Sequence, residues 1–294
     1  MNAAALDAHL ASGATHVCTC WSVVRRDGFT LGFTDHDRAI SFDGIAFMPE
    51  SGLTARALAS TTGLSVNNTE AIGVLAADAI SEADIEAGRY DGAQVTTWLV
   101  QWDNPEARTV RFVGTIGEIT RASGGFQADL RGLTDTLNQV QGRSYLTTCS
   151  AVLGDTRCGF DTSSPAFSVE TAIKDVSKAQ VFLLGSVGGY NDHWFQSGVL
   201  EVLSGAAQGL RGVIKLDRVA GDARTITLWQ PIRASIVVGD MLRLVAGCDK
   251  RAETCREKFA NLINFQGFPD IPGEDWLVSI PRADGGNTGS SRSR

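Results

Sequence analysis

Two pairs of cysteines, far apart in the chain, constrain its fold more than any other sequence feature. They are Cys149-x8-Cys158 and Cys248-x6-Cys255. Four thiolates can hold a zinc ion or an iron–sulfur cluster in one place. If both pairs contribute to one site, the chain must leave that site after Cys158, fold the residues in between and return at Cys248. The intervening segment is therefore expected to be an inserted domain.

The spacing and surroundings of these cysteines favour an object larger than a single ion. Zinc sites usually use pairs with two to four residues between the two cysteines, and both pairs here are wider. A cluster held by four thiolates carries net negative charge, which nearby cations would offset. The chain as a whole is acidic, with 26 basic and 33 acidic residues, but basic residues lie close in sequence to three of the cysteines. These basic residues are Arg157, Lys250, Arg251, Arg256 and Lys258. Two disulfides, or four unrelated buried thiols, remain the alternatives.

The rest of the sequence predicts a mainly β fold. Glycine is abundant, with 32 residues among 294, and it separates many short apolar runs. Asp-Gly at 27–28 and at 43–44 lies between apolar runs, which is a strong hairpin signal. The predicted strands are 17–24, 29–33, 39–42, 45–48, 95–102, 109–114, 118–121, 126–130, 179–184, 197–203, 212–219, 225–228 and 241–244. Short helices are expected at 3–10, at 81–87 with Ser81 as its cap, at 134–140 and at 254–263, where Phe259, Leu262 and Ile263 have helical spacing.

These segments indicate a mainly β protein of β-barrel-like domains with a few short helices and a small four-cysteine module. The expected parts are an N-terminal β domain at 1–145, a discontinuous cysteine module at 146–165 plus 246–281, an inserted second β-barrel domain at 166–245 and a disordered tail at 282–294.

Composition and motifs exclude several classes of function. No apolar run is long enough to span a membrane, and the first residues lack the pattern of a signal peptide, so synthesis in the cytoplasm is expected. A net charge of −7 without a dominant basic face disfavours direct nucleic-acid binding. No zinc-protease, nucleophile-elbow or phosphate-loop motif is present.

Two further groups of residues could carry chemistry, but both are better explained by structure. Asp35, His36 and Asp37 resemble a metal or acid–base cluster, yet they lie between two predicted strands, where Asp is common in turns. Cys18 and Cys20 are two residues apart in a predicted strand and so face the same side, as buried core thiols would.

Three stretches together carry a family resemblance. They are Leu31-Gly-Phe-Thr-Asp-His-Asp-Arg38, Cys149-Ser-Ala-Val-Leu-Gly-Asp-Thr-Arg-Cys-Gly-Phe-Asp161 and the long segment from Gly247 to Gly273. In these the chain resembles the tail hub (baseplate hub) proteins of gene transfer agents and related prophages. Its cysteine module is similar to that of the minor tail protein L of siphophages.

The resemblance implies a structural protein of the tail tip, and not an enzyme. It implies hub domains that form a homotrimer between the distal tail protein ring and the central, fibre-bearing tip protein of a released particle. It also implies a [4Fe-4S] cluster with Cys149, Cys158, Cys248 and Cys255 as its ligands, with zinc as the alternative metal. An iron–sulfur or zinc oxidoreductase, and a cell-wall hydrolase using Asp35 and Asp37, are the alternative functions.

Overall fold

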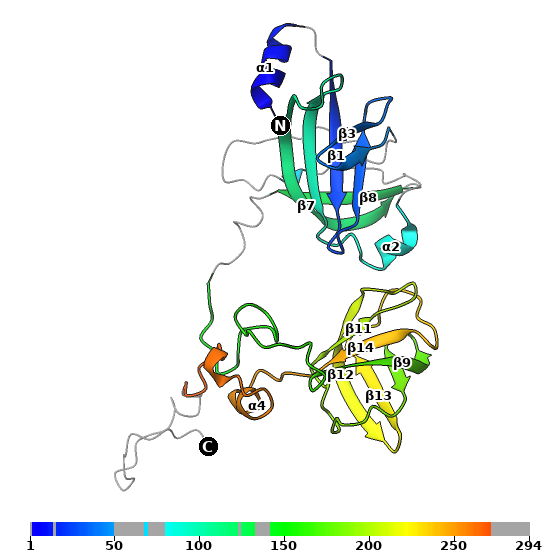
Figure 1. The fold of residues 1–294 in the computed structure, drawn as a ribbon, viewed down its shortest axis with the longest axis vertical. Helices are drawn as coiled ribbons and strands as arrows, with labels where there is room; N and C mark the ends of the chain where they lie inside the picture. Colours follow the sequence, from blue (N-terminus) through cyan, green and yellow to red (C-terminus); the bar gives the residue numbers. More distant parts are fainter. Residues whose placement is uncertain are drawn as a thin grey trace, which may run out of the picture. The chain divides into compact units, whose positions relative to one another are not determined.

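The computed structural model describes residues 2–13, 16–49, 68–69, 80–122, 125–132 and 142–271. The chain divides into two compact units, Met1–Gln141 and Gly142–Arg294 (Figure 1). Both units are built mainly from antiparallel strands, as the sequence predicts. The helix expected at 134–140 and the tail expected at 282–294 lie outside the described residues.

The first unit contains one six-stranded antiparallel sheet with the order β2-β1-β6-β7-β8-β5. Its strands are β1 (Val17–Val24), β2 (Thr30–Thr34), β5 (Asn68–Thr69), β6 (Gln94–Gln101), β7 (Arg108–Ala122) and β8 (Gly125–Gly132). A separate hairpin joins β3 (Ile40–Phe42) to β4 (Ile45–Phe47), and two helices, α1 (Ala3–Ala11) and α2 (Glu82–Glu86), complete the described elements of this unit. The barrel expected here is not closed by the described strands, which form a sheet with two ends.

Both Asp-Gly hairpins are confirmed, and the turn geometry explains them. Asp43 and Gly44 have φ angles of 50° and 75°, so both lie in the left-handed region that a tight two-residue hairpin turn requires. Gly28 has a φ of 85° in the turn between β1 and β2. Asp and Gly tolerate this region better than most residues.

Two details of the first unit differ from the prediction. The strands expected at 109–114 and 118–121 are one strand, β7, whose pairing with β8 shifts register between Ile116 and Ile119. Such a bulge keeps a strand continuous while breaking its alternation, so the sequence reads as two strands. Ser81 does precede α2, but its side chain makes no capping hydrogen bond.

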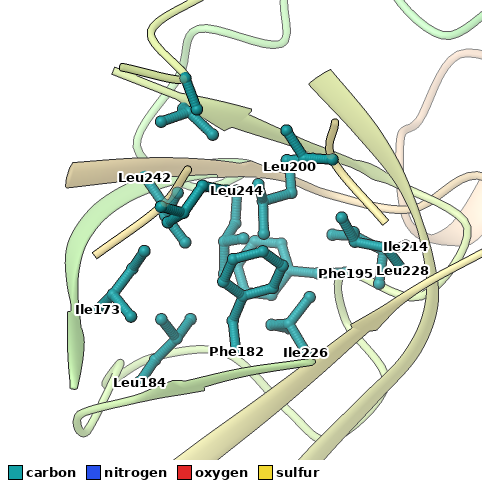
Figure 2. Close-up of a cluster of buried hydrophobic side chains, with 14 residues drawn as sticks. Ile173, Phe182, Leu184, Phe195, Leu200, Ile214, Ile226, Leu228, Leu242 and Leu244 are labelled. Carbon is teal, nitrogen blue, oxygen red and sulfur yellow. The ribbon is translucent and has the colours of Figure 1, made fainter. Parts of the chain in front are cut away.

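The second unit contains a closed six-stranded barrel with the order β10-β13-β12-β11-β14-β9. Its strands are β9 (Ser168–Ser177), β10 (Val181–Leu184), β11 (Val199–Val202), β12 (Arg211–Ala220), β13 (Ala223–Leu228) and β14 (Met241–Val245). Figure 2 shows side chains from all six strands pointing into one interior, around Phe182 and Phe195. Because alternate residues of β10, β11 and β13 are buried, these short strands follow the period-two pattern from which they were predicted.

Two predictions in this unit are wrong in an instructive way. Strand β9 was not predicted, because Ile173 is its one fully buried residue and most of its other side chains are exposed. The helix expected at 254–263 is instead α4 (Ala252–Glu257), followed by a break and the single 3₁₀ turn η1 (Leu262–Asn264). Ala260 has a φ of 48°, which ends the helix, and Ile263 is 94% exposed, so the apolar spacing there does not mark a buried helix face.

A buried ion pair lies inside the barrel. The Arg224 Nε atom of β13 donates to Asp217 Oδ1 of β12 over 2.8 Å, and both side chains are 1% exposed or less. The other carboxylate oxygen of Asp217 accepts the Phe195 backbone N–H at 2.8 Å, and Arg224 also donates to the carbonyls of Tyr190 and Asn191. The pair therefore ties the connection between β10 and β11 to two strands of the barrel.

Replacing Arg224 by Met should unfold the barrel much more easily. The change leaves the Asp217 carboxylate buried with no cation, which costs about 3–5 kcal/mol of unfolding free energy. Chemical denaturation of the full chain measures this loss. The matched control is Arg243→Met, because Arg243 pairs with Glu170 at the surface and exposed pairs contribute at most about 1 kcal/mol. Equal losses in the two variants would contradict the role assigned to the buried pair.

A candidate four-cysteine metal centre

The four predicted cysteines line one cavity of the second unit. Cys149 and Cys158 reach it from the segment before the barrel, and Cys248 and Cys255 reach it from the segment after the barrel. The free space in this cavity is small, about 10 Å³ for the centre of a water molecule, and the cavity is partly open to solvent. All four residues are free thiols. In the part of the chain that the structure describes, no group of three or more His, Cys, Asp or Glu side chains is arranged to hold a metal ion as it stands.

Asp155 positions the loop that carries Cys158. Its carboxylate accepts three backbone N–H groups, from Cys158 at 2.7 Å, Val152 at 2.9 Å and Arg157 at 3.0 Å. The hydrogen bond from Cys158 is the largest of several that lower the pKa of Asp155. The carboxylate thus folds this loop around itself and presents the Cys158 thiol to the cavity.

The second pair comes from β14 and α4. Cys255 is the buried residue of α4, and Cys248 follows β14 after two residues. The backbone N–H of Cys149 donates to the Lys250 carbonyl over 2.8 Å, so the two segments that bring the cysteines are hydrogen-bonded to each other. The Lys250 ammonium also donates to the Ala151 carbonyl.

Burial disfavours the thiolate form of two of these cysteines. Desolvation raises the pKa of Cys248, and it also raises the pKa of Cys255, with the negative charges of the other three cysteines as a further cause. Metal ligation requires the thiolate. A positively charged metal centre between the four sulfurs would oppose this effect.

Polar groups around the cavity suit sulfur ligands. Asn261 Nδ2 donates to the Cys158 carbonyl at 2.7 Å and lies 3.5 Å from the Cys158 sulfur, and the Gln266 N–H donates to the Cys149 sulfur over 3.4 Å. Lys250 and Arg251 also line the cavity. Donors and cations of this kind stabilise the negative charge of thiolates bound to iron–sulfur clusters.

Lys258 joins this module to the barrel. Its ammonium donates to the carbonyls of Trp194 and Gly247, at 2.6 and 2.9 Å, and lies 4.3 Å from the centroid of the Trp194 ring. Burial lowers the pKa of Lys258. Aromatic rings add to this contact between the cysteine segments and the barrel, because Phe167 stacks on both Trp194 and Phe259. The cysteine segments and the barrel are therefore packed together within the second unit.

The other candidate residues do not form a site. Asp35 Oδ1 accepts the Thr19 N–H at 2.7 Å, whereas the side chain of Asp37 is 84% exposed and pairs with His36. These contacts fit the turn interpretation, because the two carboxylates do not converge. Cys18 and Cys20 are both buried in the sheet of the first unit.

Three residues that support the cysteines were not predicted. Asp155 has a sequence signal that could have revealed it, because an Asp just before a turn often accepts backbone N–H groups two and three residues ahead. Asn261 and Gln266 have no such signal, since their partners are more than 100 residues earlier in the chain.

No described helix has the length and apolar character that crossing a bilayer demands.

Comparison with known proteins identifies the family. Residues 3–161 match a family model described as "Baseplate hub protein, N-terminal attachment domain", and residues 193–275 match one described as "Phage conserved hypothetical protein BR0599". The chain is also similar to a chain of a structure described as "Virion of native gene transfer agent (GTA) particle". The two are 53% identical over 97% of this chain and 98% of that chain, with a TM-score of 0.88. A search of curated proteins gave no match.

The first family model covers more than half of the chain, so the resemblance to tail hub proteins is confirmed. Membership of a structural family also supports the prediction that the chain is not an enzyme, against the oxidoreductase and hydrolase alternatives. The chain belongs to the family of phage baseplate hub proteins.

Proposed function

We propose that this chain is a structural hub in the baseplate of a particle of the gene transfer agent type, made in the bacterial cytoplasm and released with the particle. The observation that carries this proposal is the likeness over nearly the whole length to a chain of a gene transfer agent virion. The likeness includes both units and not one shared domain alone.

The hub would act as a homotrimer that joins the distal tail protein ring to the central tip protein. Homo-oligomers usually have closed symmetry, and a closed ring of identical subunits suits a position on the axis of a tail. The match of residues 3–161 to an attachment domain supports a role in which the first unit fastens the protein to its neighbour.

The cysteine module would hold a [4Fe-4S] cluster, with zinc as the alternative, on Cys149, Cys158, Cys248 and Cys255. The supporting observation is that all four line one cavity, beside N–H donors to two of the sulfurs and two cationic side chains. When bound, the cluster would cross-link segments from before and after the barrel. Its binding free energy would become folding free energy of the module, because no such site exists in the unfolded chain.

Purified particles should contain about three copies of this chain, as a trimeric hub requires. Quantitative mass spectrometry of released particles measures the copy number against a tail protein of known stoichiometry. Particles from a host that lacks the gene are the control, and they should have tails without a complete baseplate. Absence of the chain from released particles would contradict the proposed function.

The full chain, purified without oxygen, should contain about four irons and four sulfides. Cys158→Ser and Cys255→Ser should each remove most of the iron and expose residues 142–165 and 246–271 to proteolysis, while the first unit stays intact. Cys18→Ser is the matched control, because Cys18 is buried in the sheet of the first unit. One zinc per chain without sulfide would replace the cluster by the zinc alternative. Neither metal in the wild-type protein would show that the ligand assignment is wrong.

Replacing Asp155 by Ala should loosen the loop that carries Cys158, because three backbone N–H groups lose their acceptor. Hydrogen exchange at Val152, Arg157 and Cys158 should become at least about tenfold faster, as expected for one lost network of hydrogen bonds. Asp161→Ala is the control, since Asp161 accepts hydrogen bonds from the backbone N–H and the hydroxyl of Ser163. Unchanged exchange in the Asp155 variant would mean that the cysteines hold this loop without the carboxylate.

A further inference from the structure

The outside of the barrel has two different halves. Across β12, β11, β14 and β9 runs a ladder of alternating charges, Arg211–Glu201–Arg243–Glu170, in which each residue is the cross-strand partner of the next. Arg211 pairs with Glu201 at 2.8 Å, and Arg243 pairs with Glu170 at 2.7 Å. Charges that are already paired and remain solvated gain little from a protein partner. This half of the barrel is suited to solvent.

A different set of side chains occupies the outward positions of three strands: β10, β13 and β12 from Val213 onward. Most of them are aliphatic or threonine: Val181, Leu183, Val213, Thr225 and Thr227. Cross-strand pairing sets Val181 beside Thr227 and Leu183 beside Thr225, so these residues form one continuous surface. We call this surface, together with Trp229 at the end of β13, the Trp229 face.

Trp229 is the most distinctive residue of this face. Its side chain is 61% exposed, and its backbone N–H donates to the carbonyl of Val213, which is itself 54% exposed. These two exposed side chains, one aromatic and one aliphatic, form a small apolar patch on the surface of the barrel. Tryptophan in such a position is the residue most often found at the energetic centre of protein interfaces.

The Trp229 face carries a cation beside its exposed aromatic ring. The Lys215 ammonium lies 5.0 Å from the centroid of the Trp229 ring, and Arg218 lies 3.9 Å from Asp192 at the far end of the face. Asp175 of β9, the cross-strand partner of Leu183, borders the face. Among the described residues, Lys215 forms no ion pair with a carboxylate. Lys215 is therefore a cation held beside an exposed aromatic ring, in a chain whose net charge is −7.

We propose that the Trp229 face is the docking surface for a different protein of the particle, whose contact surface is apolar and carries a carboxylate opposite Lys215. The proposal rests on the proposed hub function, which supplies such neighbours. A two-fold contact of this face with itself is disfavoured, because it would bring the Lys215 ammonium groups of two copies together. A contact with another surface of a second copy is an outcome that the crosslinking experiment distinguishes.

A photo-crosslinking residue tests the identity of the occupant. We would replace Trp229 by p-benzoylphenylalanine in the full chain, assemble particles in the producing host, irradiate them and identify the adduct by mass spectrometry. The expected adduct is a different tail protein, attached within a segment that contains Asp or Glu among apolar residues. The control places the same residue at Arg243 on the ladder, where no adduct with that protein is expected.

A second measurement guards against a poorly reacting probe. Lys215→Glu should reduce incorporation of the chain into particles by about 30-fold or more if the contact is central to the interface. Arg243→Glu should reduce it much less. Because both side chains are exposed, neither change is expected to unfold the barrel, and circular dichroism of the purified variants checks this.

Three outcomes would overturn the inference: an adduct between two copies of this chain, equal adducts from positions 229 and 243, or full incorporation of Lys215→Glu without an adduct at 229. In each case the chain is still present in particles, so the hub function stands and only the docking surface fails. Absence of the wild-type chain from particles would instead contradict the hub function itself.

Discussion

The ion pair between Asp217 and Arg224 is the interaction on which the second unit depends. It lies inside a barrel whose other buried side chains are mostly apolar, and it holds the connection between β10 and β11 through the Phe195 N–H and the carbonyls of Tyr190 and Asn191. Trp194, which precedes Phe195 in that connection, accepts a hydrogen bond at its backbone carbonyl from the ammonium of Lys258, at the end of α4. A charge pair in the barrel thus fixes the position of the helix that carries Cys255, through one loop and one lysine.

The sequence predicted those parts of the fold whose signal is local. Asp43 and Gly44 specify their own turn, and the alternation of β13 specifies its own buried side. It did not predict β9, whose outward side chains are polar and whose place in the barrel is decided by β10 and β14 on either side. The spacing of Phe259, Leu262 and Ile263 predicted one helix face, because spacing carries no information about the left-handed backbone at Ala260 that ends the helix.

In the candidate site, too, the sequence predicted what is encoded locally and not what depends on distant residues. The four cysteines could be chosen from the sequence because Cys is rare, and because their two pairs flank a β-rich segment. Their supporting residues could not, since Asn261 reaches Cys158 and Gln266 reaches Cys149 across the whole inserted barrel. The pair of Asp217 and Arg224 was not predicted either, because the two residues become neighbours only when β12 and β13 form their hairpin.

The chain enters and leaves the barrel at the same place, because the first strand, β9, is paired with the last strand, β14. Ser168, the first residue of β9, is the cross-strand partner of Val245, the last residue of β14. Antiparallel partners have Cα atoms about 5 Å apart. A short turn could therefore bridge the two without moving either cysteine segment, and a barrel of different sequence or size could take the same position. The connection between the barrel and the cysteine segments would therefore allow the barrel to diversify in sequence while the cysteine segments stay the same.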